Sequence, residues 1–188
     1  MALLKALLFD LDGTLVETES INAKSYANAL NEFGVNVEAN DILNTIRGRH
    51  WSYFLPVLTE RKIANDVLAK IAARKQQIYS SLIEDVCVNK LLIELINSSA
   101  SSYKIGLVTT ASKVAVDLLL PKLGLIKEFD CIITGNDVEQ RKPHPDAYFK
   151  TANLLNVLPE ECLVFEDSEV GIQSALTFGA KVLQVHPF

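Results

Sequence analysis

The chain has 188 residues, of which 49% are hydrophobic, and a formal net charge of −5. This length and apolar content exclude a disordered chain and favour one domain, or one domain with an inserted lobe. The sequence shows no basic stripe for nucleic acid, no apolar segment long enough to span a membrane and no secretory pattern at its start. We therefore expect a soluble cytoplasmic protein, in the simplest case a monomer, that binds neither nucleic acid nor membranes.

The first predicted strand covers residues 6–9 and is followed by two aspartates, Asp10 and Asp12, and then by Gly13. An apolar run without alternation is typical of a strand that is buried on both faces of a parallel sheet. Two carboxylates so close together cost free energy unless a cation or a proton held on one of them compensates the charge. This strand end is therefore the first candidate site for a metal ion or an acid–base pair.

The segment after this strand contains no strand pattern and instead shows helical spacing of apolar residues. Helices are predicted over 21–34 and 64–82, with shorter helices around a turn at Gly48 between them. We therefore predict an all-α insert that interrupts an α/β domain. The predicted division is an α/β domain of residues 1–15 and 84–188 and an α-helical domain of residues 16–83.

After the insert, helical patterns and apolar runs alternate to the end of the chain. The helical patterns cover residues 88–100, 112–124, 146–157 and 170–179, and the apolar runs cover residues 105–108, 131–134, 163–165 and 182–185. Gly124 and Gly179 stand where the C-caps of two of these helices belong. Such alternation predicts right-handed βαβ crossovers and an α/β fold with a doubly wound, Rossmann-like parallel sheet.

Polar side chains follow the predicted strands at their carboxyl ends. Besides the first pair of aspartates, these are Thr109 after the second strand, Lys142 in the loop after the third, and Glu166 and Asp167 at the end of the fourth. Ligands of open α/β sheets bind beyond this edge, so we expect these side chains to converge there. Four acids, one hydroxyl and one lysine at a single edge are difficult to explain by stability alone.

These acids suit phosphoryl transfer. A carboxylate can attack phosphorus and form an aspartyl-phosphate, and Mg²⁺ held by hard oxygen ligands can neutralise the phosphate group. We interpret Asp10 as the nucleophile and a metal ligand, and Asp167, together with Glu166, as further metal ligands. Asp12 is interpreted as the acid that keeps a proton for the leaving group.

The basic and hydroxyl side chains complete this interpretation. Lys142 would neutralise the transferring oxygens, and Thr109 would donate a hydrogen bond to them. Thr110 and Ser112 are close enough in the sequence to substitute for Thr109. We therefore treat Lys142 and Thr109 as candidate catalytic and substrate-binding residues, and Thr110 as a candidate substrate-binding residue.

Four segments of the chain resemble the four ordered motifs of the haloacid-dehalogenase superfamily: "DLDGTL", "LVTTAS", "RKPHPD" and "VFEDSEVGIQSA". With its helical insert after the first motif, the whole chain is similar to the phosphoglycolate-phosphatase and β-phosphoglucomutase-like branch. The resemblance implies a catalytic α/β core with a helical cap, Mg²⁺ as the cofactor and a phosphate ester as the substrate. It also implies that the backbone carbonyl of Asp12 is a metal ligand. An acid at this position disfavours dehalogenation.

Two positions depart from the mutases of this branch. Asn22 stands where the mutases carry a histidine, and Trp51 stands where they carry an arginine. We therefore expect a Mg²⁺-dependent phosphatase that hydrolyses a small phosphorylated metabolite. A sugar-phosphate mutase is the alternative. A catalytically silent binding module is a third hypothesis, but the intact acids argue against it.

The predicted insert offers candidate contacts for a second part of the substrate. Its loop "IRGRHW" contains two arginines and a histidine around a glycine. Such residues would suit a substrate with a second anionic or hydroxyl-rich part. The candidate substrate-binding residues of this loop are Arg47, Gly48, Arg49 and His50.

Overall fold

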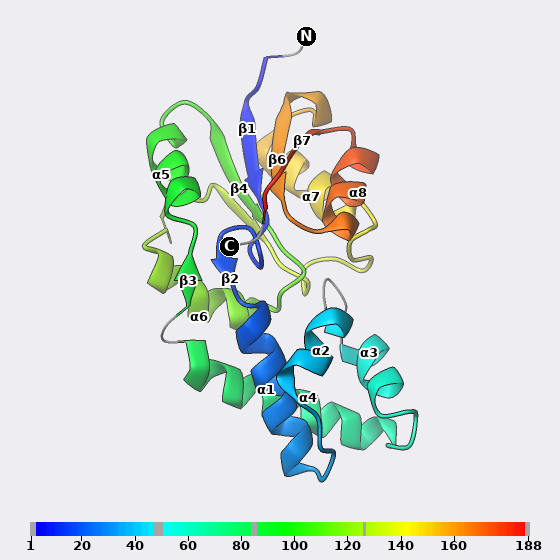
Figure 1. Cartoon of the computed structure of the whole chain (residues 1–188). Helices are drawn as coiled ribbons and strands as arrows, with labels where there is room; N and C mark the ends of the chain where they lie inside the picture. Colours follow the sequence, from blue (N-terminus) through cyan, green and yellow to red (C-terminus); the bar gives the residue numbers. More distant parts are fainter. Residues whose placement is uncertain (1–2, 47–50, 84–85, 126, 187–188) are drawn as a thin grey trace. The chain divides into compact units, whose positions relative to one another are not determined.

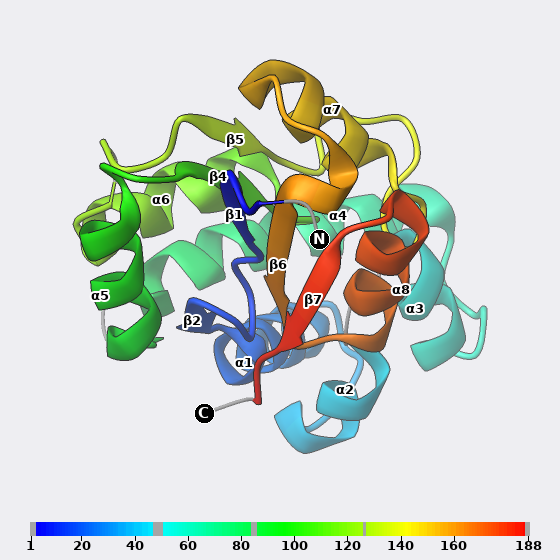
Figure 2. The ribbon, with the colours of Figure 1, turned by 90° about the horizontal axis from the view of Figure 1, so that it is seen from above.

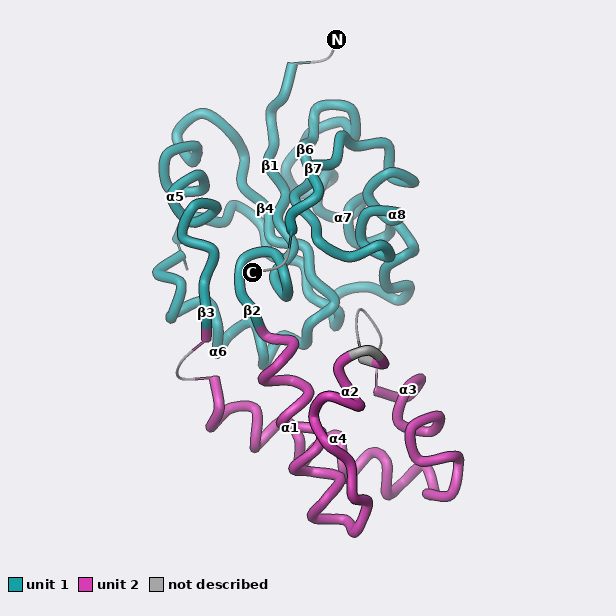
Figure 3. Tube along the Cα trace, in the orientation of Figure 1, with its two compact units in different colours: residues 1–17, 87–188 teal, residues 18–86 magenta. Residues whose placement is uncertain are grey.

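The computed structural model describes residues 3–46, 51–83, 86–125 and 127–186. The chain forms two compact units, one of residues 1–17 and 87–188 and the other of residues 18–86 (Figure 3). These divisions lie a few residues from the predicted ones, and the catalytic and cap roles of the two units remain predictions. Among the described residues, no helix is both long and apolar enough to cross a membrane.

A five-stranded parallel sheet forms the centre of the first unit (Figure 1). Its strands are β1 (Ala6–Phe9), β4 (Lys104–Val108), β5 (Cys131–Ile133), β6 (Cys162–Glu166) and β7 (Lys181–Gln184). They lie in the order β5-β4-β1-β6-β7, so the first strand in the sequence is the central one. The predicted Rossmann-like sheet is therefore confirmed.

Helices cover both faces of this sheet (Figure 2). They are α5 (Lys90–Ser99), α6 (Lys113–Leu123), α7 (Asp146–Leu155) and α8 (Glu169–Phe178). One core joins α7 and α8 to the sheet, and it includes Leu8 of β1, Tyr148 of α7 and Phe178 of α8. The left-handed backbone at Gly124 and Gly179, with φ of 67° and 98°, ends α6 and α8 where the sequence places their C-caps.

A small antiparallel pair in the first unit departs from the sequence-based expectation. Strand β2 (Val16–Glu17) pairs with β3 (Cys87–Val88), at the two points where the chain leaves and re-enters this unit. The predicted helical insert began at residue 16 and contained no strand. Strands of two residues are too short to show alternation, so hydrophobic pattern alone could not reveal them.

Within the described part of residues 18–86, four helices form the second unit. They are α1 (Glu19–Glu32), α2 (Ala39–Ile46), α3 (Trp51–Leu58) and α4 (Asn65–Leu82). Their apolar faces meet in a core of their own, in which the ring of Tyr26 packs edge-on against Phe54 with centroids 5.0 Å apart. At the edge of this core, the ammonium of Lys75 in α4 donates to Asn22 Oδ1 of α1 at 2.6 Å and lies 4.3 Å from the ring centre of Tyr79.

Close packing explains a glycine in the middle of a sheet strand. Gly106 of β4 lies opposite Leu8 of β1, and a Cβ at position 106 would lie 2.8 Å from Leu8 Cδ2 and 3.0 Å from Thr151 Cγ2 of α7. Both neighbours are fully buried and have little room to move. A glycine in a strand interior often marks such an approach of a second element.

We predict that Gly106→Ala lowers the free energy of unfolding by about 1–3 kcal/mol, because it overpacks this contact. Urea unfolding monitored by circular dichroism measures the change. The double variant Gly106→Ala with Thr151→Ser should recover part of the loss, since serine lacks Cγ2 and keeps the hydroxyl that donates to Ala147 O. Unchanged stability of Gly106→Ala would contradict the proposed packing constraint.

Candidate active site

The carboxyl ends of three neighbouring strands lie level at one edge of the sheet. Phe9 of β1 pairs in register with Leu107 of β4 and with Phe165 of β6. The next position on each strand is therefore Asp10, Val108 and Glu166. The N–H of Asp10 donates to the carbonyl of Phe165 at 3.0 Å, which extends the sheet ladder to the aspartate. The backbone alone thus brings two predicted acids to adjacent positions.

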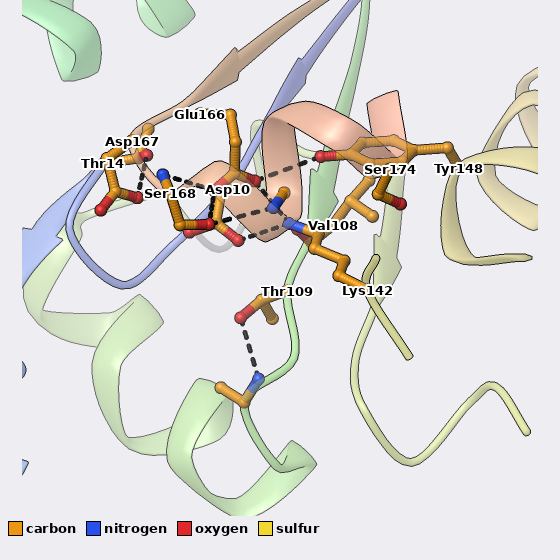
Figure 4. A network of polar contacts seen from close by, with 12 residues as sticks. Asp10, Thr14, Val108, Thr109, Lys142, Tyr148, Glu166, Asp167, Ser168 and Ser174 are labelled. Atoms are coloured by element: carbon orange, nitrogen blue, oxygen red, sulfur yellow. Dashed lines mark hydrogen bonds and ion pairs between the residues drawn. The ribbon is translucent and has the colours of Figure 1, made fainter. Parts of the chain in front are cut away.

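Lys142 joins these three strand ends (Figure 4). Its buried Nζ donates to Asp10 Oδ1 at 2.7 Å, to Glu166 Oε2 at 2.7 Å and to the carbonyl of Val108 at 2.9 Å. A lysine ammonium has three N–H donors, so these three acceptors engage all of them. A buried charge is tolerated only when it is paired and hydrogen-bonded, and this arrangement meets both conditions.

The Glu166 carboxylate is hydrogen-bonded through both of its oxygens. Besides Lys142, Oε2 accepts from the hydroxyl of Tyr148 at 3.2 Å. The other oxygen, Oε1, accepts from the Oγ of Ser168 at 2.7 Å and from its N–H at 3.2 Å. A Cβ at Gly171, in the first turn of α8, would overlap this carboxylate. The turn between β6 and α8 is therefore built closely around Glu166.

Asp167 is held by the loop that follows β1. Its Oδ1 accepts from the Oγ1 of Thr14 at 3.1 Å, and Thr14 is fully buried. A Cβ at Gly13 would overlap the Asp167 carboxylate, so only glycine allows this close approach. The loop after β1 thus contacts Asp167, the residue that directly follows β6.

Three carboxylates come close enough to share one ion. Asp10, Glu166 and Asp167 each offer an oxygen, and these oxygens all lie within 4.8 Å of one another. Burial, and then the charge of Glu166, raise the pKa of Asp10 well above its usual range despite the opposing effect of Lys142. When they are ionised, the three carboxylates have more negative charge than the single lysine balances. Hard oxygen donors with surplus negative charge fit a divalent cation such as Mg²⁺.

Lys142 remains charged in this cluster. Burial alone would lower the pKa of Lys142, but the nearby carboxylates of Asp10 and Glu166 outweigh burial and raise it well above its usual range. Its positive charge is therefore a fixed feature of the site. A fixed cation beside several carboxylates can stabilise negative charge that develops on a bound group.

The other predicted residues of the α/β domain lie at the same edge, in the segments that follow β1 and β4. Asp12 is half-buried in the loop after β1, and its backbone bridges to Val16. Thr109 is buried directly after β4, and its Oγ1 accepts from the N–H of Ala111 at 3.0 Å (Figure 4). Thr110 follows it and is half-buried. The four candidates of the insert, Arg47, Gly48, Arg49 and His50, lie outside the described residues.

Several described residues in contact with the cluster were not among the sequence-based candidates. Ser168 is the N-cap of α8, a position where serine is common, so its second role as a donor to Glu166 has no separate signal. Tyr148 lies on the apolar face of α7 and has the spacing of a core residue. Thr14 has no distinguishing pattern. Only the fold reveals that these side chains support the acids.

Comparison with known proteins assigns the family. The family model described as haloacid dehalogenase-like hydrolase matches residues 7–185. Protein CbbY of Rhodobacter capsulatus is 32% identical to this chain over 96% of the chain and 84% of its own length. Fructose-1-phosphate phosphatase YqaB of Escherichia coli is 26% identical over 95% of both chains.

The fold agrees with solved structures of this family. The crystal structure of CbbY from Rhodobacter sphaeroides in complex with phosphate matches with a TM-score of 0.88 and 24% identity, covering 99% of this chain and 88% of that one. At this identity the likeness concerns the fold, while the family match spans nearly the whole sequence. The chain therefore belongs to the haloacid dehalogenase-like hydrolases, and it is a phosphohydrolase of that family.

Proposed function

We propose that this phosphohydrolase is a Mg²⁺-dependent phosphatase that hydrolyses a small phosphorylated metabolite through an aspartyl-phosphate on Asp10. The observation that carries the proposal is the buried cluster in which Asp10, Glu166 and Asp167 offer oxygens within 4.8 Å of one another, beside the ammonium of Lys142. This arrangement combines a nucleophile, a donor set for a cation and a fixed positive charge. Phosphate-ester hydrolysis needs all three.

The metal site would use residues from two strand ends. Asp10, Glu166 and Asp167, together with the backbone carbonyl of Asp12, would hold the Mg²⁺. When bound there, the ion would neutralise the charge of the phosphate and so permit a carboxylate to approach it. The hydrogen bonds from Thr14 to Asp167 and from Ser168 to Glu166 keep two of these carboxylates oriented before any ligand binds.

The proposed chemistry has two steps. An oxygen of Asp10 forms a bond to phosphorus, the bond from phosphorus to the ester oxygen breaks, and Asp12 gives its proton to that oxygen. Asp12 then removes a proton from a water molecule, whose oxygen attacks phosphorus and displaces Asp10. Inorganic phosphate leaves, and both aspartates return to their starting states. Lys142, Thr109 and Thr110 would bind the phosphoryl oxygens in both steps.

One residue of the second unit, Asn22, favours hydrolysis over the mutase alternative. Asn22 of α1 is a neutral amide whose Oδ1 accepts from the ammonium of Lys75 at 2.6 Å. An amide does not act as an acid or a base near neutral pH. Asn22 therefore cannot transfer protons as the histidine at this position of the mutases could. The name of the Escherichia coli relative, fructose-1-phosphate phosphatase, makes a sugar phosphate the first substrate to test.

We predict that hydrolysis of p-nitrophenyl phosphate by this protein requires Mg²⁺. Excess chelator should lower the rate at least about a hundredfold, and excess Mg²⁺ should restore it, because the clustered carboxylates repel a phosphate when no cation is bound. Release of p-nitrophenolate measures the rate. A rate unchanged by chelator would exclude the proposed role of the cation.

Replacement of the proposed nucleophile should abolish turnover. We expect Asp10→Asn to lower kcat about a thousandfold or more, since an amide oxygen does not form the covalent intermediate. Asp117→Asn, on the exposed surface of α6, is the matched control and should leave kcat unchanged. Thermal unfolding of both variants checks that the fold is intact. Near-normal turnover in a folded Asp10→Asn variant would remove Asp10 as the nucleophile.

A sugar phosphate distinguishes the phosphatase from the mutase. During incubation with Mg²⁺, a hexose 1-phosphate and a trace of its bisphosphate, we expect inorganic phosphate to accumulate and the hexose 1-phosphate to be consumed. Phosphate is measured colorimetrically and the sugar phosphates by phosphorus NMR. Formation of hexose 6-phosphate without release of phosphate would favour the mutase.

A further inference from the structure

The hydrogen bonds of Lys142 conflict with its proposed part in the reaction. Its three N–H donors are all engaged, by Asp10, by Glu166 and by the carbonyl of Val108. To contact a phosphoryl oxygen, the ammonium must exchange one of these acceptors. Asp10 is the partner to exchange, because its oxygens are needed for attack and for the metal. The ammonium then depends on Glu166 and Val108 for its position.

Glu166 can hold the lysine only if Glu166 itself is fixed. Its Oε1 side is held by Ser168, and its Oε2 side, which faces Lys142, is held by the hydroxyl of Tyr148 at 3.2 Å. Tyr148 is fully buried, and its ring centre lies 5.2 Å from the Nζ of Lys142. One tyrosine therefore contacts both the lysine and the carboxylate that anchors it (Figure 4).

The hydroxyl of Tyr148 is not needed for packing. The ring stacks on Phe178 of α8, with centroids 5.8 Å apart, within the core that joins α7 and α8 to the sheet. A phenylalanine would fill the same space and keep this contact. It would also leave a buried carboxylate oxygen without one of its donors, which costs free energy. The polar atom of this side chain therefore serves the site and not the core.

We propose that Tyr148 is a positioning residue for phosphoryl transfer. It holds Glu166 so that Lys142 stays anchored while its ammonium exchanges Asp10 for an oxygen of the transferring phosphoryl group. This inference rests on the proposed phosphatase function, and it goes further by naming the residue that positions the ammonium of Lys142. The role acts through Glu166 and Lys142, without contact between Tyr148 and the substrate.

The test is Tyr148→Phe in the full chain with p-nitrophenyl phosphate and Mg²⁺. We expect kcat to fall about tenfold, as is typical for loss of a hydrogen bond to a charged group, while KM changes less than about twofold. Inhibition by vanadate, which imitates the five-coordinate transition state, should weaken by a similar factor. Tyr103→Phe is the matched control, since Tyr103 precedes β4 at the end opposite Thr109.

Two further measurements separate positioning from effects on the fold or the metal. Phe178→Leu should lower the melting temperature without lowering kcat, because it disturbs the packing of Tyr148 and leaves the hydroxyl in place. At saturating Mg²⁺, Tyr148→Phe should keep its lower kcat, because added metal can offset a weaker metal affinity but cannot restore the hydrogen bond to Glu166.

Each contrary result has a distinct meaning. Wild-type kcat in Tyr148→Phe would overturn the positioning role, and so would an equal loss of kcat in Phe178→Leu. Recovery of the wild-type kcat at high Mg²⁺ would overturn it as well, because the tyrosine would then act only through the affinity for the metal. Absence of Mg²⁺-dependent hydrolysis in the wild type would instead overturn the proposed function itself.

Discussion

The buried ammonium of Lys142 is the interaction on which the rest of the site depends. It binds the ends of three adjacent strands through Asp10, Val108 and Glu166. Without it, carboxylates at neighbouring positions of a parallel sheet would repel one another in a medium that screens charge poorly. With it, the cluster still has surplus negative charge. That surplus is what makes the site suited to a cation and then to a phosphate.

The fold supplies this cluster with little freedom to rearrange. The register of β1, β4 and β6 sets the strand ends level, and the loops then close on the acids from two sides. Gly13 and Gly171 stand where any Cβ would overlap the carboxylates of Asp167 and Glu166. Such close packing resembles a preorganised catalytic site, in which groups are oriented before the substrate arrives. Tyr148 extends this support into the core between the sheet and α7.

Most of the α/β fold and the identity of the clustered acids could be predicted from the sequence, because the first acid of each pair directly follows a short apolar run. Asp10 and Glu166 are examples. The parallel pairing of their strands then places the two residues at adjacent positions at the carboxyl edge of the sheet. Tyr148 could not be recognised, since a tyrosine at a core position of an amphipathic helix has the same pattern whether or not its hydroxyl has a partner. The pair of β2 and β3 was missed because two residues define no period. For Arg47 and its neighbours, the expectation of substrate contact stands untested.

The central claim is that Lys142 and the carboxylates form a site that transfers a phosphoryl group to Asp10. A crystal structure with Mg²⁺ and beryllium trifluoride tests it most directly, because this ion imitates a phosphoryl group bonded to a carboxylate. The account predicts beryllium bonded to Asp10, with the ammonium of Lys142 on a fluorine and still on Glu166. Beryllium bound elsewhere, or Lys142 still bonded to Asp10 with no contact to fluorine, would contradict the account.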